Sequence, residues 1–337
     1  MKPRSSPPFH FFALLAVIGL TPLSAQTATN TAPATPSAAA QLSSAAAKQK
    51  EVDYSLATRK KWIAHMPPGA VIVLDQPYVP NPVQGASSPE SNQTLDLYVP
   101  PGDGPFPLVI YIHGGAWKGG CKEGEGADMA AQWLPKGIAV ASIDYRFTLD
   151  AAFPGMFGDA LDAVAYLRAN AAKYHLDAKR IGVIGQSAGG HLAGVVAMAE
   201  GSSAYPSAGP ALQAAVLRCG FYDLTEATSQ QPKGWFPYNP RDTFAAIYPN
   251  HQIDPAIAKQ FSPIYLIHPG IPPVLIEHGD RDTTAPKIQS EMMLAALQKA
   301  GADAQLINYP TYTHNLWHPD VFANELAFFQ KSFAAVK

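Results

Sequence analysis

The amino-acid sequence predicts an α/β fold with a mostly parallel central sheet of about eight strands and helices on both faces. Short runs of apolar and β-branched residues, typical of strands buried on both faces, alternate with segments in which apolar residues recur at helical spacing. Hydrophobic residues make up 47% of the 337 residues, which is enough for a sizeable core. Because strands and helices alternate, we expect parallel strands joined by crossover helices.

The N-terminal residues predict a cleaved segment that is not part of the fold. Lys2 and Arg4 precede an apolar run over residues 11–20 that is too short to span a bilayer, and the small residues up to Ala25 are typical of a cleavage site. We therefore predict a signal peptide over residues 1–25, cut after Ala25, and a secreted or periplasmic protein. A buried N-terminal helix and a retained anchor are the alternatives. Residues 26–50 are rich in Ala, Thr, Ser and Pro and predict a flexible linker before a domain over residues 51–337.

The expected elements follow in chain order. Two early runs predict an antiparallel edge, at Val71–Leu74 and Leu95–Val99. The apolar runs that predict parallel strands are Leu108–Ile112, Ile138–Ile143, Ile181–Gly185, Ala215–Leu217, Pro273–His278 and Gln305–Tyr309. Helical spacing of apolar residues marks Leu161–Ala171, Ser187–Ala199 and Phe322–Phe333. Residues 220–272 exceed what a plain crossover needs, so they predict a short cap-like insertion over the carboxyl ends of the strands.

The strongest chemical signal lies where a predicted strand passes into a helix. The segment reads Gly185-Gln186-Ser187-Ala188-Gly189-Gly190. A nucleophilic serine needs a sharp turn that raises its hydroxyl above the sheet, and glycines leave room for that turn. This pattern predicts Ser187 as the nucleophile. The alternative is a glycine-rich packing turn, while a phosphate loop is excluded because the G-x-x-x-x-G-K-[S/T] pattern is missing here.

A second glycine-containing loop follows the strand at Leu108–Ile112 and reads His113-Gly114-Gly115-Ala116-Trp117. Acyl transfer needs main-chain N–H groups where the tetrahedral oxyanion forms. We assign this oxyanion hole to the N–H groups of Gly115, Ala116 and Ala188, and we expect His113 to hold the loop. The alternative is a tight turn without chemistry.

A serine nucleophile needs a base and an orienting carboxylate, which in this architecture follow in the order Ser, Asp or Glu, His. Asp282 is the predicted carboxylate, with Asp280 as its rival, and His314 is the predicted base. His314 and His318 have metal-ligand spacing, but no third ligand follows at a useful distance, so no metal site is predicted.

Charge and cysteine content restrict the remaining classes. The 24 Lys and Arg against 26 Asp and Glu leave a formal charge of −2, so no nucleic-acid-binding face is indicated. Two cysteines, Cys121 and Cys219, cannot make a disulfide scaffold or a cysteine zinc site. A single disulfide between them stays open for an oxidising compartment.

Taken together, these motifs resemble the α/β-hydrolase superfamily, and within it the esterase/lipase branch that includes bacterial acetyl xylan and feruloyl esterases. The resemblance runs from about Leu95 to the C-terminus. It is carried in order by His113-Gly114-Gly115, Asp144-Tyr145-Arg146, Phe153-Pro154, the Ser187 motif, Ser262-Pro263 and His278-Gly279-Asp280-Arg281-Asp282. Ala116 stands where many relatives have a third glycine, but its N–H group is unaffected. No propeller domain is attached, which argues against a prolyl-oligopeptidase-type peptidase.

The resemblance implies a secreted serine hydrolase that cleaves short acyl esters through an acyl-enzyme and needs no cofactor. Its expected partner is a small-molecule or oligosaccharide ester, such as an acetylated plant polysaccharide or a feruloyl ester, with no membrane span in the mature chain. The alternatives are a peptidase or amidase with the same triad, a non-catalytic binding module, and acyl transfer to an acceptor other than water. Trp235 and Tyr238, held between prolines in the insertion, are the expected substrate-binding aromatics.

Overall fold

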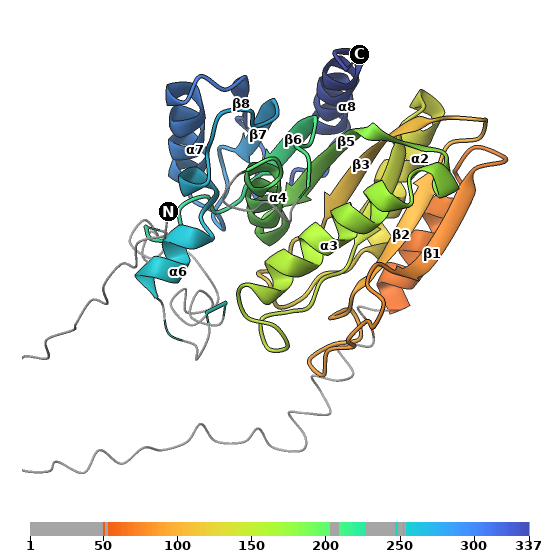
Figure 1. The fold of residues 1–337 in the computed structure, drawn as a ribbon, viewed down its shortest axis with the longest axis horizontal. Helices are drawn as coiled ribbons and strands as arrows, with labels where there is room; N and C mark the ends of the chain where they lie inside the picture. The colour runs from red at the N-terminus through yellow and green to blue at the C-terminus, as the bar shows by residue number, and fades with distance from the viewer. Residues whose placement is uncertain are drawn as a thin grey trace, which may run out of the picture. The chain divides into compact units, whose positions relative to one another are not determined.

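An eight-stranded sheet forms the centre of the protein, with the strand order β1-β2-β4-β3-β5-β6-β7-β8 (Figure 1). The strands are β1 (Val71–Pro77), β2 (Thr94–Val99), β3 (Phe106–Ile112), β4 (Ala139–Ile143), β5 (Leu176–Gln186), β6 (Ala214–Arg218), β7 (Val274–Gly279) and β8 (Ala304–Tyr309). This computed structural model describes residues 50, 53–202, 209–226, 247–248, 252 and 254–336. The predicted signal peptide, the predicted linker up to residue 49, and both Trp235 and Tyr238 lie outside the described residues.

The strand directions confirm the predicted mostly parallel sheet with an antiparallel edge. Strands β3 to β8 pair with one another in parallel, whereas β2 pairs antiparallel with both β1 and β4. The chain order reverses around β3, which lies between β4 and β5. Ligands of open α/β sheets bind beyond the carboxyl ends of the strands at such a switch point, so the loops after β3 and β5 are the expected site.

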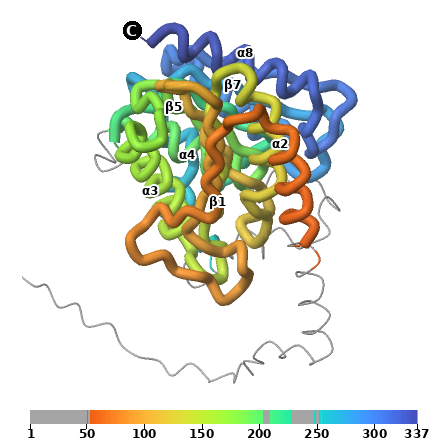
Figure 2. Tube along the Cα trace, turned by 90° about the vertical axis from the view of Figure 1, so that its right-hand side faces the viewer, coloured from red at the N-terminus to blue at the C-terminus, as the bar shows by residue number. Residues whose placement is uncertain are grey.

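Helices cover both faces of the sheet because each central strand buries both of its faces. In β3, Leu108, Ile110 and Ile112 pack into one core, while Val109 and Tyr111 pack into the other. The first core is completed by α3 (Gly155–Ala169), α4 (Ala188–Ala199), α6 (Pro255–Gln260) and α7 (Lys287–Lys299). The second is completed by a helix over residues 53–63, α2 (Glu123–Trp133) and α8 (Pro319–Ala334). Figure 2 shows α3 and α4 on one side of β1 and α2 on the other.

In the part of the chain that the structure describes, three short 3-10 helices complete the elements: η1 (Leu134–Lys136), η2 (Ala172–Tyr174) and η5 (Pro263–Tyr265). Strand β5 begins at Leu176, whereas the apolar pattern predicted a start at Ile181. The prediction began late because the first part of the strand carries polar residues that are not fully buried. An apolar pattern detects only the buried part of such a strand. Across the described residues, no helix combines the length and apolarity needed to cross a membrane.

Candidate active site

Ser187 lies at the sharp turn between β5 and α4, as the N-cap residue of that helix. Its backbone has φ 57° and ψ −119°, a left-handed conformation that is rare for a residue with a side chain. The turn is held where the Ser187 N–H donates to the Arg218 carbonyl at 2.8 Å. A Cβ on Gly185 would overlap the carbonyl of Gly189, and one on Gly189 would overlap the carbonyl of Ile112. The glycines of the motif are therefore a steric requirement of this turn.

The loop after β3 lies directly beside Ser187. A Cβ on Gly114 would be 3.3 Å from the Cβ of Ser187. Gly115, Ala116 and Trp117 are all left-handed, with φ of 117°, 53° and 57°. Among the described residues, no acceptor takes the main-chain N–H of Gly115 or Ala116, and the first N–H groups of a helix such as α4 have no intrahelical partner. Unpaired donors of this kind on both sides of a serine suit an oxyanion.

Contacts on the insertion side hold the strained loop in place. The Trp117 carbonyl accepts a hydrogen bond from the Thr148 N–H at 2.8 Å, and its indole Nε1 donates to His191 Nδ1 at 3.3 Å. His191 Nε2 in turn donates to the Phe261 carbonyl at 2.7 Å. A carbonyl only accepts and an indole only donates, so these partners determine the tautomer. Burial lowers the pKa of His191 to about 4, so it is neutral and acts as a bridge.

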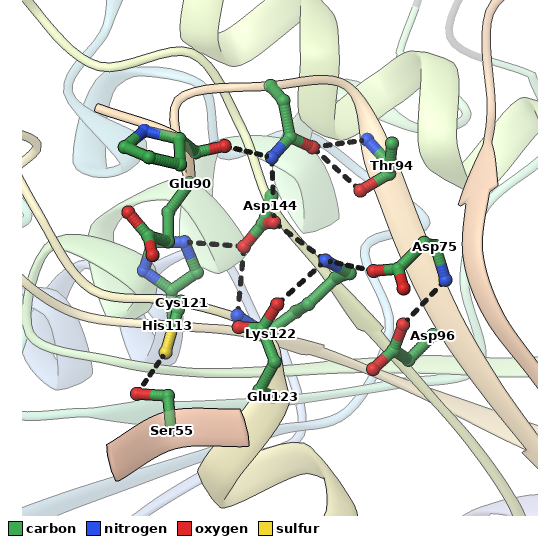
Figure 3. A network of polar contacts seen from close by, with 12 residues as sticks. Ser55, Asp75, Glu90, Thr94, Asp96, His113, Cys121, Lys122, Glu123 and Asp144 are labelled. Atoms are coloured by element: carbon green, nitrogen blue, oxygen red, sulfur yellow. Dashed lines mark hydrogen bonds and ion pairs between the residues drawn. The ribbon is translucent and has the colours of Figure 1, made fainter. Parts of the chain in front are cut away.

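The two residues that follow β4 hold the loop at both of its ends. The Tyr145 hydroxyl donates to the His113 carbonyl at 3.1 Å, and the Tyr145 ring stacks on the His113 ring with centroids 4.4 Å apart. At the other end, the Asp144 carboxylate accepts from the Lys122 N–H at 2.8 Å (Figure 3). His113 Nδ1 donates to the Gly114 carbonyl at 2.7 Å, and burial lowers the pKa of His113 to about 4. His113 is thus a neutral part of the loop.

A charge cluster continues from this end of the loop and is centred on the buried Lys122, whose side chain is 3% exposed. Its Nζ lies 2.9 Å from Asp75, 3.0 Å from Asp144 and 3.0 Å from Glu123 (Figure 3). Burial alone would lower the pKa of Lys122, but these carboxylates raise it well above its ordinary value, so the lysine is charged. Burial raises the pKa of Asp144 to about 7 against the opposing effect of Lys122.

The same cluster ties the N-terminal helix over residues 53–63 to the sheet and to the loop. Arg59 Nη1 lies 2.9 Å from Asp96 Oδ2 and 3.2 Å from Asp75 Oδ1. The Cys121 thiol donates to the Ser55 hydroxyl at 3.1 Å, which Figure 3 also shows. No motif in the sequence indicates this cluster, because its charges come from five separate segments.

Asp282 and His314 meet at the carboxyl ends of β7 and β8. His314 Nδ1 lies 2.7 Å from Asp282 Oδ2, while Asp282 Oδ1 accepts from the N–H groups of Thr284 at 2.6 Å and Ala285 at 2.9 Å. Burial raises the pKa of Asp282, but the bond with His314 and the two N–H donors outweigh it, so the net shift is downward. The rival, Asp280, instead pairs with Lys287 at 2.7 Å on a partly exposed surface. The structure thus brings Asp282, and not Asp280, to His314.

Gln186 connects this pair to the serine turn. Its Nε2 donates to the His314 carbonyl at 2.7 Å. Within the described residues, Ser187 Oγ makes no hydrogen bond to His314, and in free enzymes such contacts are often long and tighten when substrate binds. The glycine motif leaves the position of Gln186 unspecified, so the motif does not indicate this role. The ring of His318 stacks on the ring of Tyr312, with centroids 3.8 Å apart.

The described part of the insertion is packed, and the cysteines are not joined. Phe261 stacks on Phe153 with centroids 4.6 Å apart, and Tyr248 meets the same ring edge-on. These aromatics therefore attach the predicted insertion to the core.

Cys121 and Cys219 are both free thiols, so the disulfide that the sequence left open is not formed. Burial raises the pKa of Cys121 to about 12, so it is not a reactive thiolate.

Comparisons with known proteins show similarity to named esterases. Esterase LipQ of Mycobacterium tuberculosis is 30% identical over 246 residues, which cover 68% of this chain and 58% of that protein. Isoprenylcysteine alpha-carbonyl methylesterase ICME of Arabidopsis thaliana is 27% identical over 234 residues, covering 65% of this chain and 53% of that protein. The chain thus spans about half the length of the curated relatives it matches.

Solved structures share the fold. A structure described as a truncated form of carbohydrate esterase from gut microbiota superposes with a TM-score of 0.66 at 27% identity, covering 78% of this chain and 96% of that one. An esterase of Pyrobaculum calidifontis superposes with a TM-score of 0.63 at 22% identity, covering 88% and 95%, and so supports the fold alone. The protein has the α/β-hydrolase fold. Because the BD-FAE family matches residues 95–297, more than half of the 337 residues, the chain belongs to the BD-FAE family.

Proposed function

We propose that this protein is a serine hydrolase that cleaves carboxylic esters of short acyl groups through an acyl-enzyme. The observation that carries the proposal is the 2.7 Å contact between His314 Nδ1 and Asp282 Oδ2, beside a serine in a left-handed turn. An imidazole oriented in this way offers its Nε2 as a base, and a serine raised above the sheet offers its hydroxyl as the nucleophile. The named esterases among the relatives support the same chemistry.

The proposed mechanism uses groups of this chain only. His314 accepts the proton of Ser187 as its Oγ attacks the ester carbonyl, and Asp282 stabilises the imidazolium that forms. The oxyanion lies against the N–H groups of Gly115, Ala116 and Ala188, which are fixed before the reaction starts. His314 then gives its proton to the leaving alcohol. In the second half, His314 activates a water molecule that releases the acid and frees Ser187.

The proposed substrate class is a carbohydrate or aryl ester with a short acyl group, acted on outside the cytoplasm. The structural relative described as a carbohydrate esterase supports the sugar part of this proposal, and the sequence of residues 1–25 supports secretion with cleavage after Ala25. Trp235 and Tyr238 are the proposed aromatic contacts to the sugar or aryl group. Trp235→Ala should weaken the binding of an aryl or sugar ester by roughly 1–3 kcal/mol, measured as a raised KM, and should change KM for a small acetate ester less.

Labelling with a fluorophosphonate probe tests the activity directly. The wild-type protein should be labelled on Ser187, and Ser187→Ala should stay folded, remain unlabelled and lose about 10⁶ in kcat. A folded wild-type protein that the probe does not label would rule out the proposed chemistry. A panel of acetate, feruloyl and acetylated xylo-oligosaccharide esters, with matched amides, then defines the substrate. Amide turnover equal to ester turnover would point to an amidase instead.

A further inference from the structure

His278 is a fully buried histidine that the proposed mechanism does not use. It is the penultimate residue of β7, and its side chain is 0% exposed. Its Nε2 donates to the Ala285 carbonyl at 3.1 Å, and its Nδ1 lies 2.8 Å from the Ser290 hydroxyl in α7. Since a carbonyl only accepts, Nε2 carries the hydrogen and Nδ1 accepts from Ser290. The ring is therefore held at both nitrogens in one orientation.

This orientation directs the Nε2 edge of the ring toward Asp282. His278 Nε2 is 3.4 Å from Asp282 Oδ2, the same oxygen that contacts His314 Nδ1. The second carboxylate oxygen, Oδ1, accepts from the N–H of Ala285, the residue whose carbonyl His278 holds. His278 thus acts on both oxygens of Asp282. It faces Oδ2 directly, and it secures the turn that donates to Oδ1.

Other groups around His278 favour a neutral ring in this role. Burial lowers the pKa of His278, against the opposing effect of Asp282, with His314 and the more distant Lys287 lowering it further. The Cys219 thiol, buried at the end of β6, is also close, because the ligand atoms of Cys219, His278 and Asp282 lie within 4.8 Å of one another. Such a set could suggest a metal site. However, both ring nitrogens of His278 already have partners in Ala285 and Ser290, and both carboxylate oxygens of Asp282 already accept hydrogen bonds.

We propose that His278 is a positioning residue that holds Asp282 in the orientation needed to support His314. The proposal rests on the proposed function of Asp282 and His314. As His314 becomes charged during attack, the carboxylate must keep Oδ2 on Nδ1, and its other contacts must not pull it away. A misplacement of about 1 Å at such a site can cost about 10²-fold in rate. His278 thus has a role in the site that is separate from its packing in β7.

The test compares His278→Leu, His278→Gln and Asp282→Asn in the full-length protein, with p-nitrophenyl acetate as substrate. We expect His278→Leu to lower kcat by about 10²-fold with KM within twofold. His278→Gln, whose amide N–H can replace Nε2, should recover most of that loss. The downfield proton resonance of the His314 Nδ1–H bond should disappear in His278→Leu and return in His278→Gln. A purely structural role would lower the melting temperature without this pattern.

The outcomes separate the inference from the proposed function. If Asp282→Asn is severely impaired while both His278 variants keep wild-type kcat and the downfield resonance, the positioning role is wrong and the triad stands. If Asp282→Asn is itself unimpaired, the triad is wrong. If His278→Leu fails to fold, Ser290→Ala becomes the deciding variant. It removes the donor to Nδ1, so the ring is held only through Nε2. That variant should lower kcat about threefold to tenfold, and unchanged kcat would overturn the inference.

Discussion

Gln186 Nε2 donates a hydrogen bond to the main-chain carbonyl of His314 at 2.7 Å, across 128 positions of the sequence. The two residues belong to different loops. Gln186 ends β5 just before the serine, and His314 follows β8. Three strand pairings separate β5 from β8 in the sheet. The bond therefore ties the loop that carries His314 to the turn that carries Ser187.

Removing this bond should reduce turnover more than stability. In Gln186→Leu, the His314 loop loses a restraint worth about 1 kcal/mol, so kcat should fall by about fivefold. Gln213→Leu is the matched control, because the Gln213 side-chain oxygen accepts from the Ile181 N–H in the middle of the same strand, five residues before Gln186. Its kcat should stay at the wild-type value. Steady-state kinetics and thermal melts of both variants measure this, and equal kcat for Gln186→Leu and wild type would contradict it.

Substitutions of the two aspartates after β7 should have very different effects on kcat. Asp282→Asn should cost about 10⁴ in kcat, because an amide holds the wrong tautomer of the histidine. Asp280→Asn should change kcat little, since Asp280 pairs with Lys287 at a partly exposed site. Measuring kcat/KM for both variants on one acetate ester checks the ranking. The reverse ranking would transfer the orienting role to Asp280.

The buried lysine should be a major determinant of stability. Lys122→Met leaves the carboxylates of Asp75, Glu123 and Asp144 without their shared cation, so it should destabilise the fold by about 3–5 kcal/mol. Lys287→Met is the control, because its ion pair with Asp280 is partly exposed and should contribute about 1 kcal/mol or less. Urea unfolding followed by circular dichroism compares them. Similar unfolding midpoints for the two variants would refute the prediction.

His191 should make the fold sensitive to acid. Its pKa is lowered from 6.5 to about 4 by burial, so between those values the unfolded chain binds a proton that the folded chain does not. This contribution to stability is complete above pH 6.5 and is lost as the pH falls toward 4. Between pH 7 and 5 it amounts to about 2 kcal/mol. His191→Gln should show a correspondingly smaller loss in urea titrations at the two pH values, whereas the exposed His65→Gln should match wild type.

The serine turn should not tolerate a methyl group. Gly185→Ala would place its Cβ against the Gly189 carbonyl, so we expect little folded protein or a melting temperature lowered by many degrees. Gly158→Ala provides the contrast, because a Cβ there meets nothing within 4 Å and lies inside α3. That variant should be unchanged or gain up to about 1 kcal/mol from helix propensity. A folded Gly185→Ala with normal stability would show that the turn can relax.

The fold was predictable because its signals are local. Each buried parallel strand, such as β3 or β4, appears in the sequence as a short apolar, β-branched run. The alternation of such runs with helical segments predicts a mostly parallel sheet. The serine turn was also local, because the steric needs of Ser187 are met by glycines within three residues of it. The start of β5 was misplaced for the same reason, since polar residues at an exposed strand end carry no apolar pattern.

The sequence by itself thus determined the sheet, three of its covering helices and the segments that carry Ser187, Asp282 and His314. Only the tertiary structure decided between Asp280 and Asp282, which share one turn and differ in the partner that β8 brings to them. It also decided the partners of Lys122, His278 and Gln186, and it left Cys121 and Cys219 unpaired. The physical reason is that the conformation of a turn depends on neighbouring residues. A buried polar group, in contrast, depends on partners that only the crossovers bring within hydrogen-bonding distance.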